Sequence, residues 1–415
     1  MPFIQRSLLS RRTLLAGAAM TGALFRGASA REGTPERPRP APPQATPSGD
    51  AATGSVFAQM LSLAPDVLAQ PDHPVHLAQF GDVAVQLAAV GKEQPTSTED
   101  PAFEGWPAAT QWITMPTHLV RVALQPEMQE YLGFSYFQLD QGLVVGEPPN
   151  VTTFLRGRLN HDDLRAAWTN AGYRQLAVDG AAVFSIADGP ELDFENPIQR
   201  IFLANVNNAM ILADGTLVFA ASLDLIRRVL AVSAGQAPPL AEHEQVAALL
   251  SSVDQPLASA LLLDGESLAS GMVLDPRMTA EQLKQMQEDL AQSGEMPPTR
   301  LALFGVTPGG PIPAPLDQPD ATPTATDNPA IWVIRLLMAS MASAETAAET
   351  IPNRIATLTS TVRRLPYAWM FTVRRSEALS DPPVVALELD FVMGEVLPAA
   401  WHQSIVQRDL LFLAS

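Results

Sequence analysis

The chain has 415 residues, of which 47% are apolar, so its length allows about two domains with sizeable hydrophobic cores. Its 44 acidic residues against 26 basic ones give a net charge of −18, and no clustered basic patch is evident, which argues against nucleic acid as a partner. The lack of cysteine in the sequence excludes disulfides, thiolate zinc sites, iron–sulfur clusters and cysteine nucleophiles.

The first thirty residues carry the three parts of an export signal in the required order. A basic region that contains Arg11 and Arg12 comes first, a twelve-residue apolar stretch follows, and small residues end the segment at Ala28–Ala30. Twelve residues are too few to span a bilayer. We therefore expect residues 1–30 to be cleaved as a signal peptide rather than kept as an anchor, which leaves no membrane span in the mature chain.

Arg11 and Arg12 stand in the segment Ser10–Leu15, which resembles the twin-arginine (Tat) signal of exported bacterial proteins. That resemblance implies recognition by the Tat export machinery and an extracytoplasmic location in the periplasm, at the cell surface or in the medium. An ordinary secretory signal that contains two arginines is the alternative, and it implies the same compartments. Removal of the signal takes away four Arg and no acidic residue, so the mature chain is still more acidic.

Two Pro-rich segments divide the remaining chain. Residues 31–53 have almost no large apolar side chain, and such a composition cannot offset the entropy of ordering, so we expect a disordered tether. Residues 307–328 have the same character and are expected to form a mobile insertion or a linker. The rest of the sequence indicates two globular halves, 54–253 and 254–415, and the insertion belongs to the second.

The N-terminal half shows alternating strand and helix patterns. The expected elements are strands at 75–79, 133–140, 143–146 and 152–159, and helices with Asp82, Asn160 and Ser222 as N-caps. Two hairpins are expected to turn at Asp179-Gly180 and Asp214-Gly215, because these dipeptides suit tight turns with positive φ. The half therefore has the pattern of antiparallel strands with interspersed helices.

The C-terminal half repeats this order of elements. The expected elements are strands at 257–263, 300–306, 331–337, 367–373 and 384–392, a helix with Thr279 and Gln282 as a capping box, and a helical face over 351–362. Strand, helix, strand, strand appears at about 152–186 and again at about 331–392, although no residue-level identity supports the repeat. We expect an α+β fold of two related halves, each an antiparallel sheet with helices packed on one face.

Common catalytic motifs do not occur in the sequence. It contains no Gly-x-Ser-x-Gly, no Ser-x-x-Lys, no P-loop and no Gly-x-Gly-x-x-Gly, so serine hydrolase and nucleotide chemistry lack their signatures, and we expect no cofactor. His73 and His76, with Asp72 beside them, offer two nitrogens and one oxygen to a metal ion. A polar loop that enters a strand explains the same three residues, so both interpretations stay open.

The tryptophans divide into two expected groups. Trp106 and Trp112 lie in the least regular part of the N-terminal half, which favours a contact surface. Trp168, Trp332 and Trp369 fall within periodic apolar elements, which predicts that they lie in the core. One loop between strands is crowded with acidic residues and is expected to be a solvated loop rather than a glycosidase site, and its members are Asp188, Glu191, Asp193 and Glu195.

These observations favour an exported, non-catalytic binding or interaction protein of the bacterial cell envelope. Its partner would be an envelope component or a small ligand, held in a groove between the two halves. The alternatives are a hydrolase or metal-assisted enzyme built from scattered Asp, Glu and His, and a structural envelope protein. The export signal, the tether and segments such as Phe137–Asp140 and Gly146–Pro149 resemble uncharacterised secreted bacterial proteins, which implies a location and no activity.

Overall fold

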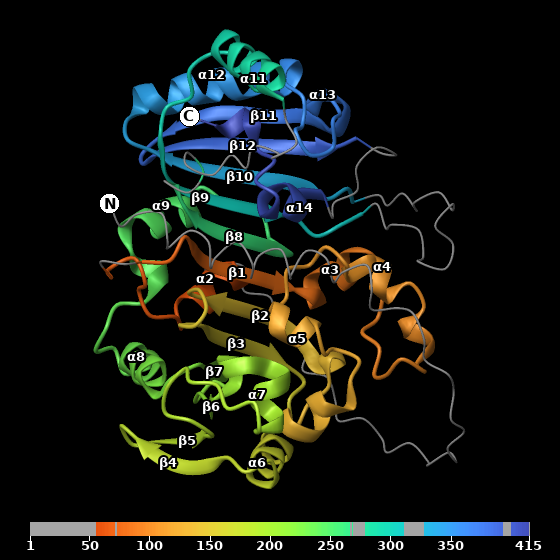
Figure 1. Cartoon of the computed structure of the whole chain (residues 1–415), viewed down its shortest axis with the longest axis vertical. Helices are drawn as coiled ribbons and strands as arrows, with labels where there is room; N and C mark the ends of the chain where they lie inside the picture. Colours follow the sequence, from red (N-terminus) through yellow and green to blue (C-terminus); the bar gives the residue numbers. More distant parts are fainter. Residues whose placement is uncertain are drawn as a thin grey trace. The chain divides into compact units, whose positions relative to one another are not determined.

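The computed structural model describes residues 55–70, 73–265, 268, 279–310, 328–392 and 400–414, all within one compact unit, Ser55–Ser415 (Figure 1). The predicted signal peptide with Arg11 and Arg12, the predicted tether, Asp72 and most of the Pro-rich insertion lie outside these residues. What the sequence predicts for those segments therefore stays a prediction.

The strands of the described residues form one twelve-stranded antiparallel sheet (Figure 1). From edge to edge their order is β11-β12-β10-β9-β8-β1-β2-β3-β7-β6-β5-β4. The strands are β1 His76–Asp82, β2 Leu139–Val145, β3 Thr152–Gly157, β4 Arg174–Val178, β5 Ala181–Ser185, β6 Asn208–Ile211, β7 Leu217–Ala220, β8 Ser259–Asp264, β9 Thr299–Val306, β10 Ile331–Met338, β11 Phe371–Ser380 and β12 Pro383–Phe391.

The two halves of the chain meet where β1 pairs with β8. Phe80 of β1 lies opposite Leu143 of β2 on one side and opposite Ala260 of β8 on the other. Strands β1 to β7 form an N-terminal block of the sheet and β8 to β12 a C-terminal block. Because backbone hydrogen bonds cross this boundary, the two halves are joined by continuous sheet, and the expected ligand groove between them stays a prediction.

Helices cover both faces of the sheet and divide the apolar core into two layers. In β10, Trp332 and Ile334 belong to the larger core, and Val333 belongs to the smaller one on the opposite face. The larger core contains residues of α3 Val83–Ala89, α4 Trp106–Thr110, α5 Thr117–Val120, α6 His161–Asn170, α7 Pro197–Phe202, α11 Ala280–Gln292, α12 Met341–Thr357, α13 Tyr367–Met370 and α14 Ala400–Val406. The smaller core contains residues of α2 Val56–Leu61, α8 Leu223–Ser233 and α9 Glu244–Ser251.

The predicted α+β class with an antiparallel sheet is confirmed. In the C-terminal block, α11 to α14 all contribute to the larger core and so lie on one face. In the N-terminal block the helices lie on both faces, because α2 and α8 pack on the smaller core. Strand, helix, strand, strand occurs as β3-α6-β4-β5 and again as β10-α12-β11-β12. The pairing differs, however, since β10 pairs with β12 whereas β3 pairs with β7.

Local signals placed three helix starts and both predicted hairpins correctly, since β4 pairs with β5 and β6 pairs with β7. Asp82 Oδ1 accepts a hydrogen bond of 2.9 Å from Val85 N, and Asn160 and Ser222 cap α6 and α8 in the same way. The Asp179-Gly180 turn has φ of 49° and 83°, the positive values that favour these residue types. Side-chain oxygen at the N-cap satisfies helix N–H groups that have no other partner, so these three helices begin where the sequence predicts.

Two predicted strands have a different structure at their start. Residues 133–140 were expected to be extended, but Ser135 and Gln138 form a capping box around a short 3-10 turn, and β2 begins only at Leu139. The segment 367–373 begins as the one-turn helix α13, and β11 starts at Phe371. The helical face expected over 351–362 ends with α12 at Thr357. Because α12 ends there, the segment that follows it can form the turn described in the next subsection.

Candidate functional site

The structure gives the two histidines of the predicted metal site different partners. His73 Nε2 lies 3.7 Å from Asp264 Oδ1 of β8, whereas His76 lies in β1 and its backbone N–H donates to Glu147 Oε1 at 2.9 Å. Burial lowers the pKa of His76, the charge of Glu147 opposes this shift, and Arg408 adds to it. Within the described residues no three His, Cys, Asp or Glu side chains gather as metal ligands. Asp72 lies outside those residues, so its part of the hypothesis stays a prediction.

The buried carboxyl group of Asp82 has a structural partner on each oxygen. Its Oδ1 caps α3, and its Oδ2 accepts a hydrogen bond of 3.2 Å from Gln141 Nε2. Burial raises the pKa of Asp82 to about 6, and the hydrogen bonds from Val85 and Gln141 oppose the shift. A carboxyl group with such a pKa suits proton transfer. Asp82 is only 2% exposed and both of its oxygens are engaged, so the geometry supports a role in holding the start of α3.

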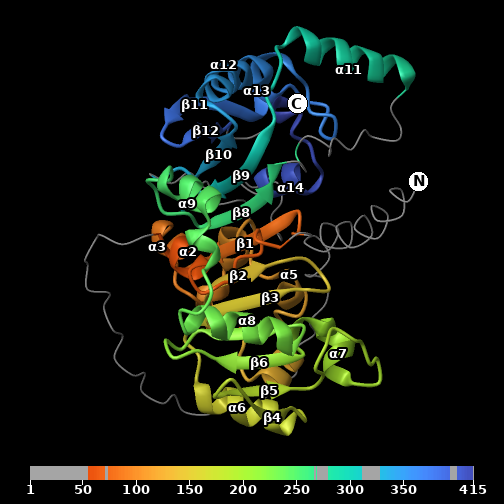
Figure 2. The same cartoon turned by 90° about the vertical axis from the view of Figure 1, so that its left-hand side faces the viewer.

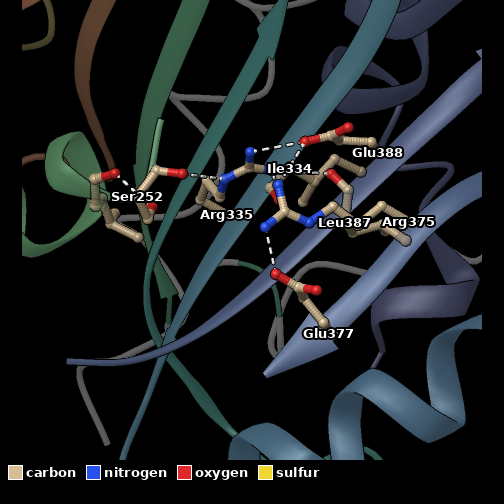
Figure 3. Close-up of polar contacts among 8 residues, drawn as sticks. Ser252, Ile334, Arg335, Arg375, Glu377, Leu387 and Glu388 are labelled. Atoms are coloured by element: carbon tan, nitrogen blue, oxygen red, sulfur yellow. Dashed lines mark hydrogen bonds and ion pairs between the residues drawn. The ribbon is translucent and has the colours of Figure 1, made fainter. Parts of the chain in front are cut away.

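A second polar cluster lies within the C-terminal block (Figure 3). Arg335 of β10 is fully buried and donates to the carbonyl oxygens of Ser252, Ile334 and Leu387 and to Glu388 Oε1 at 3.0 Å. Burial lowers the pKa of Arg335, and Glu388 opposes this shift. Glu388 also accepts from Arg375 at 3.3 Å. The cluster ties three strands and the end of α9 together, and its charges are used within the fold.

One cavity of about 230 Å³ lies beside a buried arginine. Arg354 of α12 is 3% exposed, donates to the carbonyl oxygens of Ala414 and Gly294, and leaves its Nε without a partner. Burial lowers the pKa of Arg354. The other lining residues are Leu290, Ala291, Gly294, Glu295, Met296 and Ala414. Glu295 places a carboxylate at the same wall, which disfavours a bound anion.

Three of the tryptophans reverse the expected assignment of core and surface, whereas Trp168 and Trp332 are buried as expected. Trp106 and Trp112 are 6% and 2% exposed and belong to the larger core, where Trp106 packs against the rings of Phe103, Tyr136 and Phe137. This burial corrects the expectation that they form a contact surface. Trp369 was expected in the core, yet it is 58% exposed. Because α13 has a single turn, Tyr367 and Met370 fill its buried side and Trp369 is left outside.

Trp369 follows a turn whose conformation is fixed by hydrogen bonds to a buried aspartate. The turn runs from Leu358 to Pro366, and its two ends are joined by the bridge between Thr359 and Pro366. Asp409, only 1% exposed, accepts hydrogen bonds from Ser360 Oγ at 2.5 Å and from Thr361 N at 3.1 Å. Asp409 belongs to the C-terminal segment of the chain, so these hydrogen bonds attach the turn to that segment. The hydrogen bonds therefore favour one conformation of the turn and of the residues at its tip.

The tip carries an apolar side chain and two cations. Val362 is 44% exposed, Arg364 is exposed with a left-handed φ of 57°, and Arg363 donates to Gln403 Oε1 at 2.8 Å. Neither Arg363 nor Arg364 forms an ion pair with a carboxylate in the part of the chain that the structure describes. In contrast, nearby Arg374 pairs with Asp390 at 2.7 Å. We call Val362, Arg363, Arg364 and Trp369 together the Arg–Trp surface.

The sequence around this surface contains a signal that the sequence analysis missed. Between Glu349 and Glu377 there is no acidic residue, and five arginines occur, in a chain that is otherwise strongly acidic. This stretch corrects the statement that no basic patch is evident. A scan for local charge would have found it, but only the structure distinguishes the buried Arg354 and the paired Arg374 and Arg375 from Arg363 and Arg364, which form no ion pair within the described residues.

No protein-family model, curated protein or solved structure matches this chain. Among the described residues, no helix has the length and apolar character needed to cross a bilayer. The candidate site therefore rests on the geometry of the Arg–Trp surface itself. Its elements are a preorganised turn, two cations that have no acidic partner in the described part of the chain, and an aromatic side chain that is more than half exposed.

Proposed function

We propose that this chain is an exported interaction protein of the bacterial cell envelope that binds an acidic protein segment through the Arg–Trp surface. The observation that carries the proposal is the combination of exposed Trp369 with Arg363 and Arg364, which have no acidic partner among the described residues. Trp and Arg are the residue types that contribute most to binding at protein interfaces. Arginine also offers a planar fork of donors that suits carboxylates.

Preorganisation supports binding as the role of this surface. The hydrogen bonds from Ser360 and Thr361 to Asp409 hold the turn before any partner arrives. A surface that is already ordered loses less conformational entropy when it binds. A nucleic acid is a poor fit, because its affinity requires many phosphate contacts and this surface offers two cations.

The test is binding of the purified full chain to immobilised poly-L-glutamate at low ionic strength. We expect R363Q/R364Q to weaken binding about tenfold or more. The matched control R227Q removes an exposed cation from α8, on the opposite face of the sheet, and should leave binding unchanged. Equal binding by R363Q/R364Q and the unchanged chain would overturn the proposal, as would a stronger response to a nucleic-acid probe at the same surface.

A further inference from the structure

A loop at the other end of the sheet has the properties that the Arg–Trp surface requires of a partner. Residues 187–196, which we call the acidic loop, connect β5 to α7 and contain four acidic residues. Two large apolar side chains stand among them, Leu192 at 43% and Phe194 at 60% exposed. These two side chains offer apolar surface that a partner could bury.

Hydrogen bonds with buried polar side chains also fix the backbone of the acidic loop. Gln199, 2% exposed, accepts a hydrogen bond of 2.8 Å from Asp193 N and donates to the carbonyl oxygen of Glu191 at 3.0 Å. Asn207, fully buried, donates to the carbonyl oxygen of Gly189 at 2.9 Å. The loop is therefore preorganised in the same manner as the turn of the Arg–Trp surface.

Most of the acidic side chains of the loop form no ion pair within the described residues. Asp188 lies 3.5 Å from Arg174, an exposed contact. Glu191, Asp193 and Glu195 form no ion pair within the described residues. The loop therefore offers three negative charges and two apolar side chains, and the Arg–Trp surface offers two positive charges and two apolar side chains. Phe194 and Trp369 also have the two highest exposed fractions among the exposed large apolar side chains.

We infer that the partner of the Arg–Trp surface is a second copy of this chain, which docks its acidic loop there. This inference rests on the proposed function, since it names the occupant of the same surface. The charges and the apolar side chains of the two patches are complementary. In the occupied surface, Phe194 of one copy packs on Trp369 of the other, and the free carboxylates of the loop pair with Arg363 and Arg364.

The positions of the two patches determine the form of the assembly. The acidic loop follows β5, next to the sheet edge formed by β4, and α13 precedes β11, which forms the opposite edge. Figure 2 shows α7 and α13 toward opposite ends of the sheet, as does Figure 1. A copy therefore cannot close its own loop onto its own surface. Contacts between different patches generate open, head-to-tail chains unless a rotation closes a ring.

The first test is sedimentation velocity of the purified full chain over a range of concentrations. We expect concentration-dependent association at low ionic strength that weakens strongly in about 1 M salt, where the Debye length is about 3 Å. W369A and F194A should each weaken association about tenfold or more. L124A, which removes an apolar side chain of comparable exposure on another part of the molecule, is the control and should associate normally. A chain that stays monomeric at every concentration would overturn the inference.

The second test uses complementation between defective copies. The loop variant F194A/E195R and the surface variant R364E/W369A should each be monomeric, and an equimolar mixture should form 1:1 dimers, because each copy contributes one intact patch. A mixture that stays monomeric, or association of either variant alone, would contradict head-to-tail docking. If self-association fails while binding of poly-L-glutamate still depends on Arg363 and Arg364, the proposed function stands and only this inference is lost.

Discussion

The hydroxyl of Tyr367 donates a hydrogen bond of 2.9 Å to Oδ1 of Asp409, and this bond connects α13 to the C-terminal segment of the chain. Burial and the charge of Asp409 raise the pKa of Tyr367 well above its usual range, so the hydroxyl remains a donor. The same carboxylate accepts from Ser360 and Thr361. One buried side chain thus supports both parts of the Arg–Trp surface, the turn and the helix that carries Trp369.

We expect Asp409→Asn to destabilise the protein and to loosen the turn. An amide has one acceptor oxygen in place of two, so at least one of the three donors loses its hydrogen bond. Leaving a buried donor unsatisfied lowers the free energy of unfolding by about 1–3 kcal/mol. Urea unfolding measures the loss of stability, and hydrogen exchange of the backbone amides from Thr359 to Leu365 reports the loosening of the turn. Tyr367→Phe removes one donor and is the milder comparison. An Asp409→Asn chain with unchanged stability and exchange would show that the carboxylate does not hold the turn.

The ion pair of Arg335 and Glu388 should be costly to break on one side only. Glu388→Gln leaves the fully buried guanidinium without its charged partner, which corresponds to about 3–5 kcal/mol in other buried pairs. The double variant Arg335→Met with Glu388→Leu should recover most of that loss, since no charge stays buried. Denaturant unfolding of Arg335→Met, Glu388→Leu and the double variant measures the coupling between the two side chains.

The pair of Arg374 and Asp390 provides the comparison for that experiment. Its side chains are 42% and 35% exposed on the neighbouring strands β11 and β12. Exposed pairs contribute about 0–1 kcal/mol, so Arg374→Gln should change stability little. A similar loss in the buried and the exposed pair would mean that burial does not determine the cost here.

Asp82 should make stability depend on pH. Its pKa is about 6 in the folded chain against 3.8 ordinarily, so the folded state binds the proton more tightly than the unfolded state. The unfolding free energy therefore falls as the pH rises from about 4 to about 6, by about 3 kcal/mol at about 1.4 kcal/mol per pKa unit. Asp82→Asn cannot ionise and can still cap α3. Its stability relative to the unchanged chain should rise over that pH range.

The matched control for Asp82 is the partly exposed N-cap Asp100. Hydrogen bonds from the backbone N–H groups of Ala102 and Thr96 lower the pKa of Asp100, so its charged form stabilises the folded state. That contribution is present above the unfolded pKa and is lost as the pH falls. Asp100→Asn should therefore lose relative stability as the pH rises, the reverse of Asp82→Asn. The same direction in both variants, measured by urea unfolding at a series of pH values, would contradict the assignment for Asp82.

Quenching of tryptophan fluorescence tests the exposure of Trp369 directly. Trp369 is 58% exposed, and the other five tryptophans are at most 6% exposed. We expect acrylamide to quench a fraction of the emission that disappears in Trp369→Phe, with little change in stability. Trp112→Phe should retain that fraction. Quenching that persists in Trp369→Phe would place the accessible tryptophan elsewhere.

The sequence predicts features that depend on neighbouring residues and misses those that depend on distant ones. Asp82, Asn160 and Ser222 cap their helices through bonds that reach two or three residues along the chain, so the pattern alone locates them. The exposure of Trp369 depends on where a one-turn helix lies against the core, and periodicity over four residues cannot determine it. The support from Asp409 likewise comes from about fifty positions further along the chain.

The pairing of β1 with β8 has a consequence for how the chain acquires its fold. β1 pairs with β2 early in the sequence, but its second neighbour, Ser259–Asp264, follows all the other strands of the N-terminal block. Until β8 arrives, one edge of β1 presents unpaired backbone groups, and such edges recruit strands from other chains. β8 thus completes the strand pairing of the N-terminal block and is also the first strand of the C-terminal block. A fragment that ends before it should aggregate, because the N-terminal half depends on the next segment of the chain for its solubility.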